Sequence, residues 1–199
     1  MKALVTGATW FIGRHLAAGL ESPHTLSRSA SAGAIAWNPE AESAPSKALA
    51  GADAVIHLAG EPVVDGRWTE EKKRRIRDSR LKGTRNLVAG IAELPAAERP
   101  RVLVSASAVG YYGDRGDETL TESSAPGTDF LSGVCQGWET EAAKARDLGL
   151  RVVSLRIGVV LGPGGGALAK MLTPFSLGLG GPIAGGRHWM PWIQIGDLV

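Results

Sequence analysis

Short runs of apolar residues alternate along the chain with longer segments in which apolar residues recur at helical spacing. The apolar runs predict strands at residues 2–6, 25–27, 34–37, 54–58, 101–105 and 151–157. Several of these runs are continuous rather than alternating, as expected for a parallel sheet covered by helices on both faces. The helical spacing predicts helices at about 11–20, 69–93 and 130–148. This β-α order predicts an α/β fold with a doubly wound parallel sheet.

The segment 69–93 has the clearest helix ends. Thr69 is a favourable N-terminal cap, two glutamates follow it, and Pro95 prevents continuation of the helix. The apolar face of this helix carries Arg80, and a buried cation needs a partner. A structural ion pair and a cofactor phosphate both stay open as that partner. The basic run 72–77 predicts a solvated helix face rather than a nucleic-acid patch, because acidic residues are interspersed.

Composition and charge narrow the class of protein without identifying it. The 199 residues fit one domain, and 22 basic against 20 acidic residues leave a net charge of +2. No segment is apolar over the roughly 18 residues that a membrane span needs. We expect no signal peptide, no nucleic-acid partner and a cytoplasmic location. Cys135 is the one cysteine, and we expect it to be a buried apolar residue rather than a reactive thiol.

A glycine-containing turn follows the first predicted strand and opens the first predicted helix. Gly7 and Gly13 occupy the first and last glycine positions of a dinucleotide-binding turn. The unpaired N–H groups at the start of the helix can hold a pyrophosphate. Trp10 stands where the pattern has its middle glycine, so its indole could swing outward, cover the cofactor or fill the site. The candidate cofactor residues of the turn are Gly7, Thr9, Trp10, Phe11, Ile12 and Gly13.

The end of the second predicted strand indicates the type of dinucleotide. An NAD site has Asp or Glu there, whereas an NADP site has a basic residue. This chain has Ser27 and Arg28, and Arg28 comes 21 positions after Gly7. Arginine can bind a 2′-phosphate through two hydrogen bonds, and serine adds a donor. We therefore expect NADP(H) in preference to NAD(H), with a plain surface arginine as the alternative.

Further motifs follow in order along the chain. They are Asp53-Ala54-Val55-Ile56-His57-Leu58-Ala59-Gly60-Glu61-Pro62, Ser79-Arg80, Ser105-Ala106-Ser107-Ala108-Val109-Gly110-Tyr111-Tyr112-Gly113, Trp138-Glu139, Arg156-Ile157-Gly158-Val159-Val160-Leu161-Gly162 and Pro191-Trp192-Ile193. With the glycine turn, this series resembles the epimerase branch of the atypical short-chain dehydrogenase/reductases. That NAD-dependent epimerase/dehydratase-like family includes proteins described as nucleoside-diphosphate-sugar epimerases or as cell-division-inhibitor-like. The resemblance covers essentially all 199 residues, and it implies a Rossmann-type NAD(P)-binding fold.

The resemblance implies further cofactor contacts at matching positions. Leu58, Ala59 and Gly60, at the end of the fourth predicted strand, would lie beside the adenosine ribose and the pyrophosphate. Arg80 would then face the cofactor, and Val160, after the sixth predicted strand, would line the nicotinamide side. The histidines have no spacing typical of metal ligands. We therefore expect no metal, and we expect the histidine at position 57 to be a buried core residue.

The resemblance also implies catalytic positions, with one departure from the family pattern. Related enzymes use a serine near the end of the fifth strand and a Tyr-x-x-x-Lys pair, whose tyrosine exchanges a proton during hydride transfer. Ser107 matches the serine, and Tyr111 or Tyr112 stands for the tyrosine of the fifth-strand motif. The Tyr-x-x-x-Lys pair itself is absent, because Leu131 and Cys135 occupy its positions.

Two functions of different classes stay open at this point. The chain is either an NADP(H)-dependent oxidoreductase or epimerase with non-standard acid–base groups, or a non-catalytic NADP(H)-binding regulatory or structural protein. The catalytic candidates are Ser107, Tyr111 and Tyr112, with Asp114 nearby, and loop packing is their alternative role. The expected partner is a small or nucleotide-sugar-like substrate, and a homodimer is left open.

The domain organisation follows from the same resemblance. Residues 1–161 are expected to form the dinucleotide-binding Rossmann domain, and residues 162–199 a Gly/Pro-rich loop with the start of a substrate lobe. Related chains continue beyond this point, so we expect the lobe to be incomplete. The segment 162–191 is expected to be an irregular loop over the ligand-binding edge of the sheet. Trp189 and Trp192 would anchor this loop or offer a platform for a sugar ring.

Overall fold

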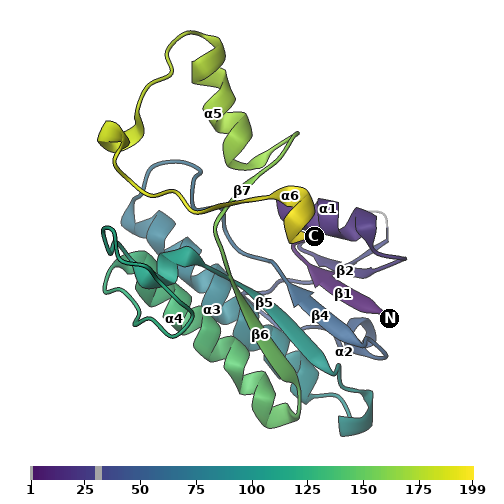
Figure 1. The fold of residues 1–199 in the computed structure, drawn as a ribbon. Helices are drawn as coiled ribbons and strands as arrows, with labels where there is room; N and C mark the ends of the chain where they lie inside the picture. Colours follow the sequence, from purple (N-terminus) through teal and green to yellow (C-terminus); the bar gives the residue numbers. More distant parts are fainter. Residues whose placement is uncertain (1, 30–32) are drawn as a thin grey trace.

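The computed structural model of the protein describes residues 2–29 and 33–199. A six-stranded sheet lies at its centre in the order β3-β2-β1-β4-β5-β6, and every neighbouring pair is parallel (Figure 1). The strands are β1 (Ala3–Thr6), β2 (His24–Ser27), β3 (Ala34–Ala36), β4 (Ala54–His57), β5 (Val102–Ala108) and β6 (Arg151–Ile157). This order confirms the predicted doubly wound Rossmann fold.

The direction of the chain across the sheet reverses between β1 and β4. β1 pairs with β2 on one side and with β4 on the other, so successive strands are added toward opposite edges. In open α/β sheets, ligands bind at such a switch point, in the crevice beyond the carboxyl ends of the strands. The glycine turn follows β1 and the segment that begins at Leu58 follows β4. Both segments therefore border the crevice.

Three long helices cover the sheet: α1 (Phe11–Gly19), α3 (Glu70–Ala92) and α4 (Phe130–Ala143). α3 and α4 lie side by side on one face (Figure 1). Because α1 joins β1 to β2 in the opposite direction across the sheet, a right-handed crossover places it on the other face. Shorter helical segments complete this part: α2 (Ser46–Leu49), η1 (Ala96–Glu98), η2 (Val109–Tyr112) and η3 (Lys144–Leu148).

The main hydrophobic core lies between the sheet and α3. Leu4, Val55 and Leu103, on three neighbouring strands, are fully buried together with Leu87 and Ile91 of the helix. These strand residues occupy matching register positions, since Leu4 pairs with Val55 and Val55 pairs with Leu103. Ile76, Gly83, Leu87 and Ile91, which recur at helical spacing on α3, are all buried. Burial of this face stabilises the helix against the sheet, at about 25 cal/mol for each Å² of apolar surface.

The helix α3 begins as its sequence predicts. The Oγ1 atom of Thr69 accepts a hydrogen bond from the backbone N–H of Lys72 at 3.2 Å. The prediction of a solvated basic run is wrong at Lys72, whose side chain is only 5% exposed and whose Nζ lies 2.8 Å from Glu61 Oε1. The loop after β4 brings this carboxylate to the start of the helix. The ion pair compensates for the burial of the lysine charge.

Residues 159–199 lie outside the six-stranded sheet. β7 (Val159–Leu161) and β8 (Trp192–Gln194) form a separate parallel pair, and α5 (Gly166–Ser176), η4 (Ile183–Gly186) and α6 (Ile195–Leu198) complete the segment. The prediction of an irregular loop over 162–191 is wrong at α5. Alanine, leucine, lysine and methionine from 167 to 172 are good helix formers, and Pro174 enters only in the last turn.

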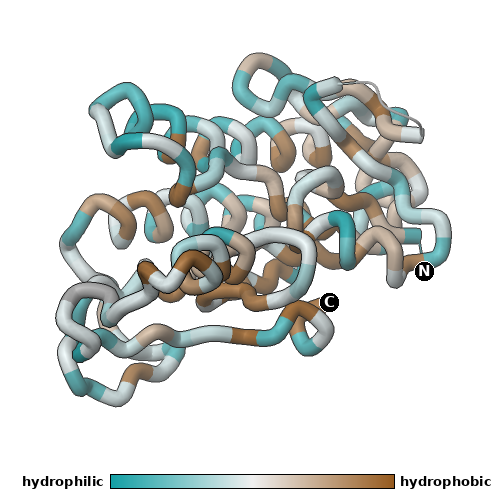
Figure 2. Tube along the Cα trace, turned by 90° about the horizontal axis from the view of Figure 1, so that it is seen from above, coloured by the Kyte–Doolittle hydropathy of each residue, from teal (hydrophilic) through white to brown (hydrophobic). Residues whose placement is uncertain are grey.

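The helix α5 and its neighbours project away from the sheet (Figure 1). None of the α5 residues is buried. Figure 2 shows hydrophobic positions in the interior and also along the segment that leads to the C-terminus. The large apolar side chains that this segment exposes are Leu172, Phe175, Leu177, Leu179, Trp189, Met190 and Trp192. None of the helices in the described ranges combines the length and apolar character that crossing a bilayer requires.

Candidate functional site

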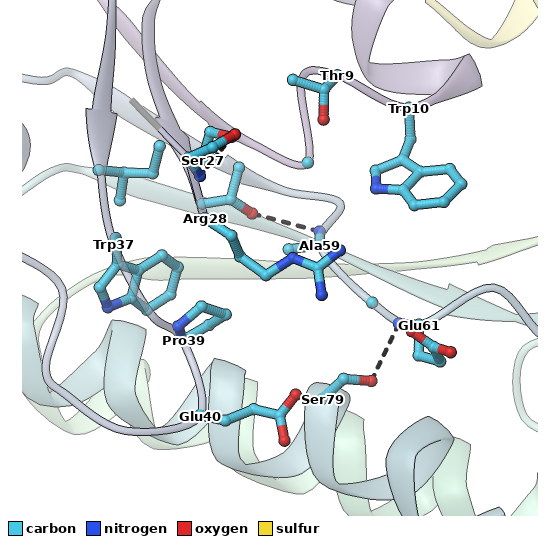
Figure 3. Close-up of a pocket in the computed structure, with 15 residues that line it drawn as sticks. Thr9, Trp10, Ser27, Arg28, Trp37, Pro39, Glu40, Ala59, Glu61 and Ser79 are labelled. Atoms are coloured by element: carbon cyan, nitrogen blue, oxygen red, sulfur yellow. Dashed lines mark hydrogen bonds between the residues drawn. The ribbon is translucent and has the colours of Figure 1, made fainter. Parts of the chain in front are cut away.

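A cavity of about 350 Å³ opens at the switch point of the sheet (Figure 3). Its wall combines the glycine turn, the end of β2, the segment after β3, the loop after β4 and one residue of α3. The lining residues are Thr6, Gly7, Thr9, Trp10, Leu26, Ser27, Arg28, Ser29, Trp37, Pro39, Glu40, Ala59, Gly60, Glu61 and Ser79. Its volume falls within the range of roughly 300–1,000 Å³ that is usual for small-molecule sites.

The glycine turn requires both of its glycines for steric reasons. Gly7 has φ +74°, and a Cβ atom on it would lie 2.9 Å from the backbone nitrogen of Ala59. A Cβ atom on Gly13 would lie 2.2 Å from the carbonyl oxygen of Gly7. Backbone atoms cannot move aside as a flexible side chain can, so any larger residue would push the helix start away from the strand. The turn therefore keeps the N-terminus of α1 directly at the crevice.

The other predicted residues of the turn divide between two surroundings. Thr9 and Trp10 line the cavity. Phe11 points elsewhere, since its ring lies 5.0 Å from that of His15 and a Cβ atom on Gly166 would come 2.9 Å from its Cδ1 atom. Phe11 therefore connects α1 to the segment before α5 rather than to the cavity. Ile12, the next predicted residue, is half-buried in α1 and does not line the cavity either.

Arg28 is the cationic side chain in the cavity wall. It follows β2 directly, with Ser27 and Ser29 on either side, and all three residues line the cavity. Figure 3 shows its guanidinium reaching into the cavity toward Ala59. Ser27 Oγ accepts a hydrogen bond of 3.4 Å from the backbone N–H of Ser29. An anion entering here would meet a guanidinium fork and two hydroxyl groups.

The loop after β4 closes the far side of the cavity. Its conformation is held by two hydrogen bonds, from the Ala59 backbone N–H to Thr6 Oγ1 at 3.3 Å and from the Glu61 backbone N–H to Ser79 Oγ at 3.0 Å (Figure 3). Ala59 and Gly60, two of the predicted cofactor residues, line the cavity. Leu58 lies against Gly7 through its backbone and does not line the cavity.

Arg80 lies behind the cavity wall rather than in it. Its Nη1 atom donates to the carbonyl oxygens of Glu61 at 3.0 Å and of Ile76 at 3.1 Å. The guanidinium carbon lies 5.0 Å from the centre of the Trp138 ring. A Cβ atom on Gly60 would come 3.2 Å from that carbon. The cation on the apolar helix face is thus satisfied by two carbonyl groups and an aromatic face, and the sequence reasoning considered neither.

His57 is the last residue of β4, directly before the loop that borders the cavity. It is the buried core residue that the sequence predicts. Its side chain is fully buried. Nδ1 lies 2.7 Å from Thr6 Oγ1, and Nε2 lies 3.0 Å from Thr84 Oγ1. Burial, with a smaller contribution from the nearby charge of Arg80, lowers the pKa of His57 to about 4. The imidazole is therefore neutral near pH 7.

A second polar group, which we call the Glu139–Arg156 cluster, lies at the carboxyl ends of β5 and β6. Arg156 binds Glu139 through Nε–Oε1 and Nη2–Oε2 hydrogen bonds, both of 2.9 Å. Ser107 Oγ donates to Glu139 Oε1 at 2.6 Å. Arg156 Nη1 donates to the Tyr112 hydroxyl at 2.9 Å, and its Cζ atom lies 3.5 Å from the centre of the Tyr111 ring. The three predicted catalytic residues therefore meet in one cluster.

Sequence reasoning did not assign a site role to either charged member of this cluster. Burial acts to raise the pKa of Glu139, but hydrogen bonds from Arg156 and Ser107 outweigh it and hold the pKa below its ordinary value of 4.5. An available signal was Arg156, an arginine between two apolar residues near the end of the sixth predicted strand. A glutamate one turn after Cys135 on the predicted helix was another. Burial raises the pKa of the Cys135 thiol, which agrees with the expected inert, apolar role.

Three cavity residues were not predicted from the sequence, although their position after a strand could have indicated them. Trp37, Pro39 and Glu40 follow β3 and form one wall of the cavity (Figure 3). The carboxyl ends of parallel strands meet at one edge of the sheet, so the residues after the third predicted strand were candidates by position alone. Trp37 is 3% exposed and donates from Nε1 to the carbonyl oxygen of Glu42 at 3.0 Å. The wall is therefore firmly placed.

The remaining predicted positions lie away from the cavity. Val160 belongs to β7 and pairs with Ile193 of β8. Trp189 Nε1 donates to Asp117 Oδ1 at 2.7 Å, which ties the C-terminal segment to the loop after η2. Asp114 is exposed and accepts a hydrogen bond from the backbone N–H of Gly116 at 3.1 Å, so it shapes a turn. In the described ranges, no group of three or more His, Cys, Asp or Glu side chains could hold a metal ion.

Comparison with known proteins agrees with this geometry. The model of the NAD dependent epimerase/dehydratase family matches residues 3–199. The chain is 42% identical, over 211 residues, to the chloroplastic SDR39U1 homolog of Arabidopsis thaliana, an epimerase family protein, and the match covers all of this chain and 60% of the relative. It is 39% identical to human SDR39U1, with 100% of this chain and 68% of the relative covered. The chain thus spans roughly two thirds or less of the length of these relatives.

Two solved structures are similar over the whole chain. Human SDR39U1 (isoform 2), crystallised with NADPH, has a TM-score of 0.87 at 38% identity, and 67% of that protein is covered. The nucleoside-diphosphate sugar epimerase of Corynebacterium glutamicum has a TM-score of 0.83 at 40% identity, with 42% of its chain covered. The fold, the glycine turn and the full-length match agree, and the chain belongs to the NAD dependent epimerase/dehydratase family.

Proposed function

We propose that this chain binds NADP(H) in the cavity at the switch point. The observation that carries the proposal is Arg28, which directly follows β2, lies between two serines and reaches into the cavity. This is the position from which a Rossmann protein contacts the ribose 2′ group, and a guanidinium there selects a 2′-phosphate over a 2′-hydroxyl. The human relative crystallised with NADPH supports the same cofactor.

The residues of the turn suit the rest of an adenine dinucleotide. The N-terminus of α1 presents free N–H groups and a positive dipole end to the crevice, as a pyrophosphate requires. Gly7 and Gly13 allow the close backbone packing that keeps these N–H groups at the crevice. Trp37 and Pro39 offer an apolar wall to the adenine, and Ser27, Arg28 and Ser29 would surround the 2′-phosphate.

Titration calorimetry with NADPH and NADH tests the proposal. Arg28→Ala should weaken NADPH binding about 10–100-fold, because hydrogen bonds to a charged group contribute about 1.5–3 kcal/mol. NADH binding should change less than about twofold, since NADH lacks the 2′-phosphate. Arg74→Ala removes an equal charge from an exposed helix position outside the cavity and serves as the matched control. Equal losses for both dinucleotides in Arg28→Ala would contradict the assignment.

The proposed activity is that of an oxidoreductase or epimerase on a small or nucleotide-sugar-like substrate. Bound nicotinamide would supply hydride transfer. Ser107, Tyr111 and Tyr112 are the residues of this chain proposed to position the substrate and exchange protons, because they gather at the carboxyl ends of β5 and β6. The net charge of +2 gives no support to a nucleic-acid partner.

A non-catalytic role is the second candidate, and one observation favours it. Ser107 donates a hydrogen bond to Glu139, and the Tyr112 hydroxyl accepts one from Arg156, so both candidate groups already have a partner within the protein. Leu131 and Cys135 also replace the usual tyrosine–lysine pair. Incubation with NADPH or NADP⁺ and a panel of sugar nucleotides separates the two functions. Turnover or an epimerised product by NMR supports the enzyme, and tight cofactor binding without either supports the non-catalytic protein.

The proposal includes a cytoplasmic location. Cys135, free and buried, fits a reducing compartment. Because the Arabidopsis relative is named as chloroplastic, cell fractionation of the source organism is the direct test. Recovery in an organelle or envelope fraction would contradict this part of the proposal.

A further inference from the structure

The cavity covers only one part of the path that a dinucleotide would follow. Its lining residues come from the adenosine side, around β2 and β3, and from the glycine turn. Ser107, Tyr112 and Val160, predicted for the nicotinamide side, are not among them. A ligand that extends from Arg28 toward Ser107 must pass the start of α1. Trp10 is the residue that caps the start of α1, and it lines the cavity there.

The indole of Trp10 lies in the crevice rather than on the outer surface of the turn. Figure 3 shows it hanging from the start of α1 on the side of Ala59 and Glu61, across the cavity from Trp37. The Trp10 backbone is extended, with φ −91° and ψ 173°, a conformation open to any residue. Tryptophan at this glycine position therefore leaves the turn intact and places a large ring in the cavity wall at the start of α1, where the pyrophosphate of a dinucleotide would bind.

Few interactions hold this ring in place. Trp10 is 48% exposed, and within the described part of the chain its indole nitrogen makes no hydrogen bond. By comparison, Nε1 of Trp37, of Trp68 and of Trp189 each donates to an oxygen atom at 2.7–3.0 Å, whereas Trp138 and Trp192, like Trp10, have no such bond within the described residues. An exposed side chain without such a bond changes rotamer within nanoseconds. The ring can therefore move while the turn stays fixed.

We propose that Trp10 is a gate between the two halves of the cofactor site. With the ring in the observed position, the open cavity admits the adenosine 2′-phosphate half of NADP(H). The nicotinamide half enters only after the ring rotates away. This inference rests on the proposed function. It assigns Trp10 a role in that site: the indole lowers the affinity for whole NADP(H) below the value that the contacts of its adenosine half would give.

The gate is tested by comparing NADPH with 2′,5′-ADP, which keeps the 2′-phosphate and lacks the nicotinamide half. Calorimetry on Trp10→Gly should give NADPH binding about 3–10-fold tighter than in the original chain, because the bound state no longer has to exclude the observed rotamer. The affinity for 2′,5′-ADP should stay within about twofold. Stopped-flow measurements should show faster association of NADPH and an unchanged rate for 2′,5′-ADP.

Two further variants control for effects unrelated to the crevice. Trp10→Phe keeps an aromatic ring of smaller size and should fall between the original chain and Trp10→Gly. Trp68→Phe removes another partly exposed indole, 45% exposed and outside the cavity, and should leave both affinities unchanged. Thermal unfolding without ligand checks that the variants are folded, and glycine is well tolerated at a helix cap.

Each outcome separates the gate from the proposed function. If both ligands bind the original chain and Trp10→Gly alters them equally, or alters neither, the gate is wrong while NADP(H) binding stands. Weaker NADPH binding in Trp10→Gly would show that the indole contacts the cofactor and would also overturn the gate. If neither ligand binds the original chain or Trp10→Gly, the proposed function is wrong, and the gate with it.

Discussion

The end of the crevice between β1, β2 and β4 contains an open cavity, whereas at the carboxyl ends of β5 and β6 charged and aromatic side chains bind one another. The first end depends on glycines whose Cβ atoms would meet backbone. The second end contains the Glu139–Arg156 cluster, in which every charged group already has a partner. We therefore expect cofactor binding to depend mainly on the first end, and the Glu139–Arg156 ion pair of the second end to contribute mainly to stability.

The largest effect is expected at Gly13. In Gly13→Ala the new Cβ atom would stand 2.2 Å from the Gly7 carbonyl oxygen, and relief requires the helix to move. We expect the free energy of unfolding to fall by about 3 kcal/mol and NADPH binding to weaken at least tenfold. Gly19→Ala is the control, since no atom lies within 4 Å of a Cβ at that end of α1. Urea unfolding measures the stability of both variants, and calorimetry measures their NADPH affinity. Similar losses in Gly13→Ala and Gly19→Ala would show that the close packing of the glycine turn is not what binding at this end of the crevice depends on.

A pH effect of nearly the same size is expected from His57 beneath the cavity. Its native pKa of about 4 lies below the ordinary value of 6.5, so between these values the unfolded chain binds the proton more readily. This contribution to stability is complete above pH 6.5 and is lost as the pH falls toward 4, by about 3 kcal/mol in total. Urea unfolding over this window should give a flatter pH dependence for His57→Asn. Parallel curves for the two proteins would contradict the assignment.

A smaller loss is expected at the other end of the crevice. Glu139→Ala leaves Arg156 without its carboxylate, and the two side chains of this pair are only 17% and 19% exposed. We expect the free energy of unfolding to fall by about 2 kcal/mol, less than for a fully buried pair, with NADPH affinity changed less than about twofold. A tenfold loss of NADPH affinity would show that the two ends are not separate in function.

The smallest effect is expected for an exposed ion pair of similar geometry. Glu118→Ala breaks the Arg115–Glu118 pair, whose side chains are 29% and 48% exposed. We expect a change below about 1 kcal/mol, since solvent screens such a pair. Urea unfolding of Glu118→Ala and Glu139→Ala under the same conditions measures how much burial adds to the stabilisation by an ion pair. If Glu118→Ala lost as much unfolding free energy as Glu139→Ala, burial would not explain the stability of the Glu139–Arg156 pair.

The predicted elements were mostly right because their signals are local. The strands 2–6 and 54–58 appear as Ala3–Thr6 and Ala54–His57, and the helix 69–93 appears as Glu70–Ala92. Apolar runs and helix caps act over a few residues, so a single sequence contains them. The helix α5 was missed because surrounding glycines and prolines outweighed its short run of helix formers.

Some of the residues predicted to contact the cofactor line the cavity and others do not, for a spatial reason. Gly7 and Arg28 follow strands directly, and the carboxyl end of a parallel strand places its next residues at the ligand edge. Trp37 obeys the same rule and was overlooked. Phe11, Leu58 and Arg80 lie near the cavity without lining it, because small rotations of helix and loop decide which side chains face the ligand.

The sequence by itself determined the alternation of strands and helices, the tight turn at Gly7 and the basic residue after β2, since each depends on neighbours a few positions away. Only the tertiary structure decided which polar groups meet. Arg80 binds the Glu61 carbonyl 19 positions away, and Ser107 donates to Glu139 32 positions away. A buried polar group must find a partner wherever the packing of helices and strands supplies one. The arrangement of helices and strands in space decides these partners, and a local sequence pattern does not predict that arrangement.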